Sequence, residues 1–291
     1  MKVRRGYPRI SLSPRSSVAR RIVSDWFWYK LYEKTGSTVA DSAGNLPTIT
    51  LGGTLTNIWD NVGWLTIEPV AGNDSYSAIG NAANAAMFNM ANWNNKQMIL
   101  AWDFYFDGGI TTTETFFGYG ANTSAVSGWW MQINTSNQLT FCYRGVGGSN
   151  QSALNAAGFN AGTDPAAGAN TRLALLADIR VTQNQYADID FYCNGVSVTG
   201  LTNFDLKANA ATALPGDVPA AQTQQPFVLF GRKNSTASLT SDQKIGPGGS
   251  TGRMSNIFGI LIDTPDDTLP IELNTAFYEN RGDLPRALIG V

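Results

Sequence analysis

The chain has no histidine and only two cysteines among its 291 residues. Without an imidazole there is no Ser-His-Asp or Cys-His catalytic group and no His-bearing zinc site, and two thiols cannot form an all-cysteine zinc site. No apolar run approaches the roughly 18 residues that a membrane span requires. The basic N-terminus continues into Ile22-Val23-Ser24-Asp25 rather than into an apolar signal core. We therefore expect a protein made in the cytoplasm without a signal peptide, and no membrane partner.

The charges are few and unevenly placed. Seven of the 20 cations precede the first acidic residue, Asp25, and they are Lys2, Arg4, Arg5, Arg9, Arg15, Arg20 and Arg21. The remaining 13 cations face 22 acids, so residues 22–291 carry a net charge of −9. Prolines and serines oppose regular structure in residues 1–24. We predict an extended basic arm that binds an acidic partner surface, and a solvated tail is the alternative. Nucleic acid is not the expected partner, because it would repel an acidic body.

An alternation of apolar and polar residues recurs from Asp25 onward. It is clearest in residues 98–106, where every second residue is a large apolar one (Met98, Leu100, Trp102, Phe104 and Phe106). The same period of two appears in residues 129–133, 139–143, 173–181 and 258–262. Such runs predict half-buried strands, and many of them separated by turn residues predict a sandwich of two antiparallel sheets.

Turn and helix signals complete the pattern. Asn194-Gly195 lies between two apolar runs and predicts a hairpin of type I′, because that turn needs positive φ at both central residues. Helical spacing is limited to a short turn near residues 81–90 and a helix after Pro270, where Leu273, Phe277 and Tyr278 share a helix-like spacing.

Five segments follow one another in a characteristic order. They are residues 28–45, which lead into a Gly-Ser-x-x-x-Asp-Ser-x-Gly-Asn loop, and residues 172–181, 190–196, 227–233 and 252–258. This series resembles the strands and loops of laminin-G-like, concanavalin A-like jelly-roll domains, with Asn256 where an acidic residue is more usual. The resemblance implies an all-β, two-sheet antiparallel jelly-roll sandwich over residues 25–291, preceded by the arm at residues 1–24. Lectins, glycanases, adhesion modules and viral structural proteins share this fold, so function must be argued from the site.

One segment tests the glycanase alternative. Glucanases of this family carry alternate carboxylates on one strand, which supply a nucleophile and a general acid. Here Asp188 and Asp190 would lie about 7 Å apart on one strand face, but Tyr192 stands where the general acid would be. We therefore interpret these three residues as the solvent face of an ordinary strand, and we predict no catalytic residues and no enzymatic activity.

Aromatic residues suggest a second role. Trp93 in an asparagine-rich stretch, Tyr119 between glycines, and Trp130, which alternates outward from its neighbours, are candidates for stacking on a sugar. Structural burial of these rings is the alternative, since large aromatics are usually buried. No cofactor is expected. Calcium stays possible because the family often binds it through loop acids, and the loop residues Asn73-Asp74, Asp263 and Asp266-Asp267 are of the right type.

A jelly roll that has a cationic arm and no expected signal peptide is similar to accessory proteins of tailed-bacteriophage particles. The resemblance implies a non-enzymatic virion protein, for capsid decoration or stabilisation, whose arm binds other virion proteins and whose copies form a homo-oligomer on the particle. Arginine suits such an arm because its planar guanidinium makes paired bonds to carboxylates. The alternatives are a host-glycan-binding fibre protein and, less favoured, a glycan depolymerase.

Overall fold

A computed structural model describes most of the strands and one helix. The described residues are 26–31, 36–46, 48–52, 65–67, 76–79, 87–106, 113–123, 126–134, 136, 138–144, 151–154, 171–182, 186–205, 227–229 and 252–279. The predicted arm and its seven cations lie outside these residues, as does most of the segment 81–90 in which we expected a turn.

The first sheet, sheet A, has seven strands in the described part of the chain, all in antiparallel pairs. Its order is β1 (Trp26–Lys30), β15 (Gly252–Ile262), β6 (Lys96–Phe106), β11 (Thr171–Thr182), β12 (Tyr186–Cys193) and β13 (Val196–Asp205), with β4 (Leu65–Ile67) paired to β15. The N-terminal and C-terminal strands thus lie side by side at one edge.

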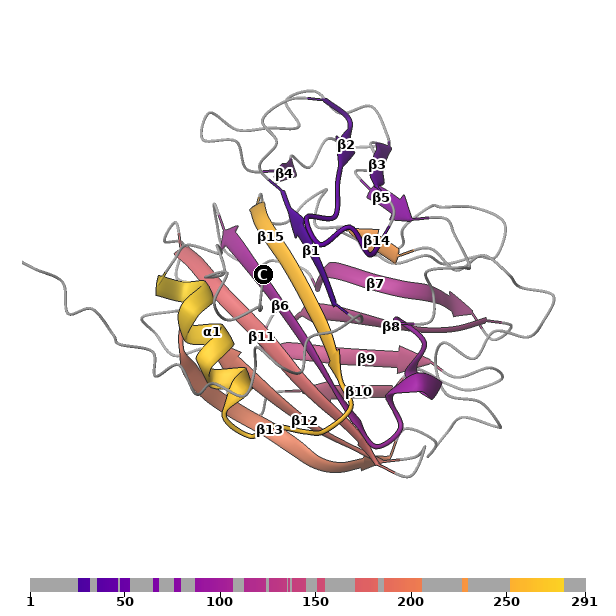
Figure 1. The fold of residues 1–291 in the computed structure, drawn as a ribbon, viewed down its shortest axis with the longest axis vertical. Coiled ribbons are helices and arrows are strands. Elements are labelled where there is room, and N and C mark those ends of the chain that lie inside the picture. The colour runs from indigo at the N-terminus through magenta and orange to yellow at the C-terminus, as the bar shows by residue number, and fades with distance from the viewer. Residues whose placement is uncertain are drawn as a thin grey trace, which may run out of the picture.

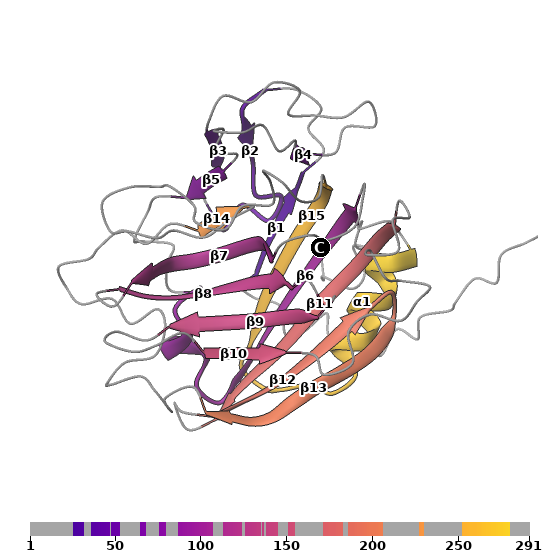
Figure 2. The ribbon, with the colours of Figure 1, turned by 180° about the vertical axis from the view of Figure 1, so that it is seen from behind.

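The second sheet, sheet B, has eight described strands, again in antiparallel pairs. Its order is β10 (Gln151–Leu154), β9 (Leu139–Arg144), β8 (Val126–Ile133), β7 (Glu114–Thr123), β14 (Phe227–Leu229), β5 (Tyr76–Ile79), β3 (Ile49–Gly52) and β2 (Thr38–Val39). The two sheets form two layers whose strands cross at an angle, as the front and back views show (Figures 1 and 2). The predicted all-β sandwich is confirmed.

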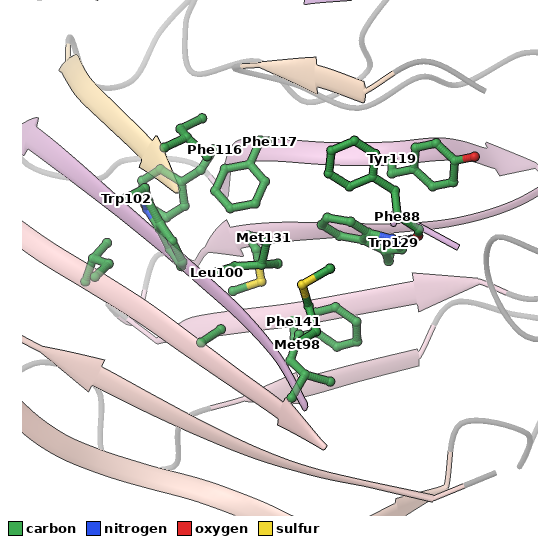
Figure 3. Close-up of a cluster of buried hydrophobic side chains, with 14 of the residues drawn as sticks. Phe88, Met98, Leu100, Trp102, Phe116, Phe117, Tyr119, Trp129, Met131 and Phe141 are labelled. Carbon is green, nitrogen blue, oxygen red and sulfur yellow. Dashed lines mark hydrogen bonds between the residues drawn. The ribbon is translucent and has the colours of Figure 1, made fainter. Parts of the chain in front are cut away.

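The interior between the sheets is built from the alternating apolar residues. Met98, Leu100 and Trp102 of β6 face Phe117 and Met131 of sheet B, and all are fully buried (Figure 3). Aromatic rings contact one another throughout this interior, as Trp102 does Phe117 in an edge-to-face pair with ring centroids 5.1 Å apart. Burying these side chains removes apolar surface from water, which is the main stabilising contribution to such a fold.

The hairpin between β12 and β13 forms as the dipeptide predicted. Asn194 and Gly195 have φ values of 52° and 81°, so both central residues adopt the left-handed conformation of a type I′ turn. On β12, Phe191 and Cys193 point into the interior. Both cysteines of the chain, Cys142 and Cys193, are buried and reduced.

Helices are few among the described residues. A 3₁₀ turn, η3, spans Met90–Trp93, and helix α1 spans Leu269–Glu279, where the sequence predicted a helix after Pro270. Leu273 and Phe277 pack against the outer face of sheet A, whereas Tyr278 is 44% exposed. The helix lies over β11 and also contacts β6, β12 and β13, on the side of sheet A away from sheet B (Figures 1 and 2). None of the described helices has the length and hydrophobicity of a membrane-spanning segment.

Candidate functional site

The outer face of β11 is charged at both ends and apolar in the middle. Ala174 and Leu176 lie under α1 in a second hydrophobic cluster, separate from the interior of the sandwich. Arg172 stands at one end of this stripe, and Asp178 and Arg180 stand at the other. Because side chains alternate along a strand, the inward residues of β11 complete the core while the outward ones hold the helix. We call this region the helix-covered face.

The C-terminal end of α1 is held by a buried ion pair. The Nε of Arg172 donates to Oδ1 of Asp103 over 2.8 Å, and the two terminal nitrogens donate to the carbonyl oxygens of Phe277 and Tyr278, each over 3.0 Å. The hydroxyl of Ser255 donates to the second oxygen of Asp103 over 2.7 Å. One guanidinium thus neutralises a carboxylate in strand β6 and caps the last carbonyls of the helix, where a cation is also favoured by the helix dipole.

The N-terminal end of α1 is held by a second pair. Nε and Nη2 of Arg180 donate to Oδ2 of Asp178 over 3.1 and 2.9 Å, and Nη1 is paired with the exposed carboxylate of Asp267. Oδ1 of Asp178 accepts from Gln97 over 2.9 Å. Gln97 also exchanges hydrogen bonds with the backbone of Asp266, at 2.8 and 3.1 Å. This end of the helix is therefore tied to β6 and β11 through side chains of the preceding loop.

The first turn of α1 has its own cap. Oδ1 of Asp266 accepts hydrogen bonds from the backbone nitrogens of Thr268 and Leu269, over 3.0 and 3.3 Å. A carboxylate at this position satisfies free N–H groups and interacts favourably with the helix dipole. Both termini of an 11-residue helix are thus neutralised by charges of the appropriate sign.

The two buried carboxyls titrate abnormally. Burial raises the pKa of Asp103 and of Asp178 to about 6, while the adjacent Arg172 or Arg180 lowers it by less. A carboxyl with such a pKa could transfer a proton near neutral pH. Here, however, the two side chains are 0% and 1% exposed, and both of their oxygens are bonded to structural groups. Their role is to hold the helix.

The suspected glycanase residues lie beside this N-terminal pair. In the strand register Asp190 is opposite Asp178, and Asp188 is opposite Arg180. Asp188 and Asp190 are half-buried, and burial is the main cause that raises the pKa of Asp190, followed by the charges of Arg180, which lowers it, and Asp188, which raises it. Tyr192 is only 8% exposed and packs in the cluster under α1. Our expectation of a solvent-facing Tyr192 is wrong, because the helix covers that face.

The loop that suggested the jelly-roll resemblance is organised by one aspartate. Asp41 accepts four backbone hydrogen bonds, from Trp28, Ala43, Asn45 and Leu46, at 2.7 to 3.0 Å. The motif Asp-Ser-x-Gly-Asn therefore encodes a structural loop clamped against β1. Because each carboxylate oxygen of Asp41 accepts two backbone hydrogen bonds, we interpret this residue as structural and not as a ligand for a metal or a substrate.

Two of the predicted glycan-binding aromatics are in the interior. Trp93 is 0% exposed and donates its indole N–H to the carbonyl of Met87 over 2.8 Å. Tyr119 is 2% exposed and stacks on Phe88, with ring centroids 5.5 Å apart (Figure 3). The exposure that we expected for them is wrong, because the asparagines and glycines around them mark turns and strand packing and not an open surface.

Trp130 lies on the outer face of sheet B, as its alternation predicted. Its ring is nevertheless only 2% exposed, so the expected open platform is absent, and its indole N–H donates to Oε1 of Gln132 over 2.9 Å. A Cβ at Gly118 would lie 2.8 Å from the Cβ of Trp130, so glycine is required beside this ring. Across the strands, Thr115 and Thr140 flank Gln132, and the hydroxyl of Thr115 is buried without a hydrogen-bond partner.

The loop acids proposed as calcium ligands have other partners where the structure describes them. Asp263 pairs with Lys96 at 2.7 Å, Asp267 pairs with Arg180, and Asp266 caps α1. Within the described residues no group of three or more Asp, Glu or Cys side chains is arranged to hold a metal. Asn73-Asp74 lie outside the described part.

The helix-covered face itself was not identified from the sequence. A usable signal existed in β11, where the outward positions read Arg172, Ala174, Leu176, Asp178 and Arg180. An outward stripe that is apolar at its centre and charged at its ends indicates a covering element about as long as the apolar part. The distant partners, Asp103 and Ser255, could not be paired with Arg172 from spacing alone.

Comparisons with known proteins give the fold. Neither the family models nor the curated proteins contain a match to this chain. Among solved structures, the binding domain of botulinum neurotoxin serotype C1 matches with a TM-score of 0.56 and 11% identity, covering 90% of this chain and 52% of that one. A structure of botulinum neurotoxin type C, whose cell entry depends on interaction with two ganglioside molecules, matches with a TM-score of 0.55 and 10% identity, covering 90% and 52%.

The Trypanosoma rangeli sialidase in complex with sialic acid also aligns, with a TM-score of 0.49 and 11% identity over 88% of this chain and 33% of the sialidase. The chain thus spans about half the length of the toxin chains and a third of the sialidase. At this identity the likeness concerns architecture alone. The chain has an all-β sandwich fold of the kind found in these toxin binding domains.

Proposed function

We propose that this chain is a non-enzymatic structural module of a virion, which decorates or stabilises the capsid and is attached through its basic arm. The observation that carries the non-enzymatic part is the closure of the helix-covered face. There α1 lies over the strand face on which a glycanase of this architecture would present its acids, and the buried Asp103 and Asp178 are bonded on both oxygens. The assignment to a virion rests on the sequence resemblance, and the attachment rests on the charge of residues 1–24.

Catalysis is tested directly on Asp188 and Asp190, the half-buried carboxylate pair that a glycanase of this architecture would use. We expect no reducing-sugar release from a panel of β-glucans by the full chain. Release that disappears in Asp190→Asn and persists in Asp263→Asn, a change at an exposed loop acid, would establish a hydrolase and overturn the non-enzymatic assignment.

Attachment is tested on particles purified from the host in which they assemble. Deleting residues 1–23 should remove the protein from the particle, because the arm supplies the cations for carboxylates of a neighbouring subunit. Replacing the seven cations of the arm by glutamine should have the same effect while keeping its length. Particles that still carry the deleted form at full occupancy would refute attachment through the arm.

A second candidate, glycan binding, is favoured by the outer face of sheet B. On that face Gln132 is half-buried beside the ring of Trp130, whereas Thr115 and Thr140 are fully buried, so of these three the Gln132 amide is the group that could bond a sugar hydroxyl. One similar structure, that of botulinum neurotoxin type C, concerns ganglioside interaction of the toxin. A glycan array with the full chain tests this role. Binding that is lost in Gln132→Ala but kept in Ser136→Ala, in the adjacent turn, would support it, and a blank array would contradict it.

A further inference from the structure

One side of helix α1 is partly exposed to solvent. Ile271, Thr275 and Tyr278 are spaced by four and three residues, so they lie on one side of the helix. Ile271 is 41% and Tyr278 is 44% exposed. Val196, 60% exposed, follows Gly195, which lies against Thr275. These four residues form a small apolar stripe on the surface.

Acidic side chains follow this helix and the loop before it. Residues 263–279 contain five acidic side chains and no lysine or arginine, and the acids are Asp263, Asp266, Asp267, Glu272 and Glu279. Asp263 and Asp267 are 81% and 86% exposed. Asp263 and Asp267 are already paired with Lys96 and Arg180, and Asp266 caps α1, whereas Glu272 and Glu279 form no ion pair with the described residues. We call the apolar stripe together with these acids the acidic helix face.

The chain enters the sandwich close to this face. Trp26, the first residue of β1, pairs with Ile260 of β15, and Ile262 of the same strand immediately precedes the acidic loop. β1 is three strand positions from β11 in sheet A, about 14 Å. Arg20 and Arg21 precede Trp26 by six and five residues, which span about 17 to 21 Å when extended. The last cations of the arm can therefore reach the acids beside α1 of their own chain.

We propose that the basic arm of the same chain docks on the acidic helix face. Its cations pair with Glu272 and Glu279 of α1, and its sparse apolar residues, such as Tyr7 and Ile10, cover Ile271 and Tyr278. Attachment through a short tether gives an effective concentration in the millimolar range, so individually weak ion pairs suffice. This inference rests on the arm being an anchor, as proposed above. It names the surface of its own chain that the arm occupies before the arm binds a neighbouring virion protein.

Crosslinking in the full-length chain tests the docking. Ser17→Cys is combined with Ile271→Cys, and the dilute protein is treated with a short bis-maleimide. The control pair is Ser17→Cys with Thr38→Cys on β2, an exposed residue of a strand that lies away from α1 in both views (Figures 1 and 2). The native cysteines are buried, and burial raises the pKa of Cys193 to about 12, so the chain without added cysteines serves as a blank.

We expect an intramolecular crosslink in the first pair and little in the control pair. Neutralising two acids by Glu272→Gln and Glu279→Gln should reduce the crosslink about fivefold, the size expected of two exposed ion pairs. The variant with Thr38→Lys and Thr48→Lys, which changes net charge equally at exposed positions elsewhere, should leave it unchanged. Salt at about 0.5 M should reduce the yield of the crosslink, because it screens the charges of the arm and the helix.

Two results would overturn the proposal. Equal crosslinking in both pairs would mean that the arm has no preferred surface, and crosslinked dimers in place of monomers would assign the face to the arm of a second copy. Neither result depends on particle attachment. If the arm docks here and the deleted form still occupies particles, then only the attachment proposal fails.

Discussion

The two ends of helix α1 are held by similar ion pairs in different surroundings. At the C-terminal end, Arg172 serves Asp103 and two helix carbonyls, so a single carboxylate balances a single cation. At the N-terminal end, Arg180 is bonded to Asp178 and Asp267, and Asp190 lies opposite Asp178 in the strand register. The first pair is electrically balanced, whereas the second has an excess of negative charge.

This difference separates two physical roles of a buried ion pair. The C-terminal pair makes hydrogen bonds to backbone that no other described side chain replaces, so its loss leaves both a buried charge and uncapped carbonyls. The N-terminal pair shares its arginine with an exposed acid, and Asp178 retains Gln97 as a second partner. We therefore expect the C-terminal end to contribute more to stability and the N-terminal end to respond more to salt.

Arg172→Met should have the largest effect. It leaves Asp103, fully buried, without its cation, and the expected loss in the free energy of unfolding is about 3 to 5 kcal/mol. Urea denaturation measures it. Adding Asp103→Asn should recover part of the loss, because the uncompensated charge is removed. A loss below about 1 kcal/mol would mean that the pair contributes little and that the comparison of the two ends fails.

Arg180→Met should lower the free energy of unfolding by less, about 1.5 to 3 kcal/mol, which is the range for hydrogen bonds to a charged group. The cost is smaller because Asp178 keeps the Gln97 amide and the nearby Asp190 favours proton uptake by Asp178 when the cation is gone. The same urea experiment compares both variants. A larger loss for Arg180→Met than for Arg172→Met would reverse the assignment of the two ends.

The pH dependence tests both buried carboxyls together. Their pKa in the folded protein is about 6, above the value near 3.9 of an unfolded chain, so the folded state binds protons more tightly. The free energy of unfolding should therefore rise as pH falls from 7.5 through 6 toward 4, by about 1 to 3 kcal/mol per carboxyl. No histidine contributes to this interval. Thermal unfolding of Asp103→Asn with Asp178→Asn should show a flatter profile, and an unchanged slope would contradict these pKa values.

Asp267→Ala should have the smallest effect. The carboxylate is 86% exposed, and an exposed ion pair contributes about 0.5 kcal/mol or less. At about 1 M salt the difference from the unchanged chain should vanish, whereas the effect of Arg172→Met should persist because its partner is buried. Calorimetry at low and high salt compares the two. A salt-independent loss at Asp267 would show that its contact with Arg180 is structural.

Local patterns predicted much of the architecture. The alternation in residues 98–106 and 173–181 corresponds to β6 and β11, and Asn194-Gly195 forms the expected turn. The spacing of Leu273 and Phe277 corresponds to α1. These features follow from short-range rules, in which a period of two or of 3.6 residues specifies the element and which side is apolar.

The candidate site was predicted less well. Alternation correctly gave the side of sheet B on which Trp130 lies, but it carries no information about whether that side is exposed. Tyr192 was expected to face solvent for the same reason and is covered by α1. In both cases a segment distant in sequence decides burial, and single-strand patterns cannot describe it.

The amino-acid sequence by itself determined the class of elements, the exclusion of histidine chemistry, and the separation of a cationic N-terminus from an acidic body. Only the tertiary structure decided that α1 closes the outer face of sheet A and that Arg172 meets Asp103, 69 residues away. The physical reason is that strand and helix periodicity depends on residues close together in the sequence. A buried charge instead needs a partner that offsets the cost of removing it from water, and folding brings that partner from a distant part of the chain.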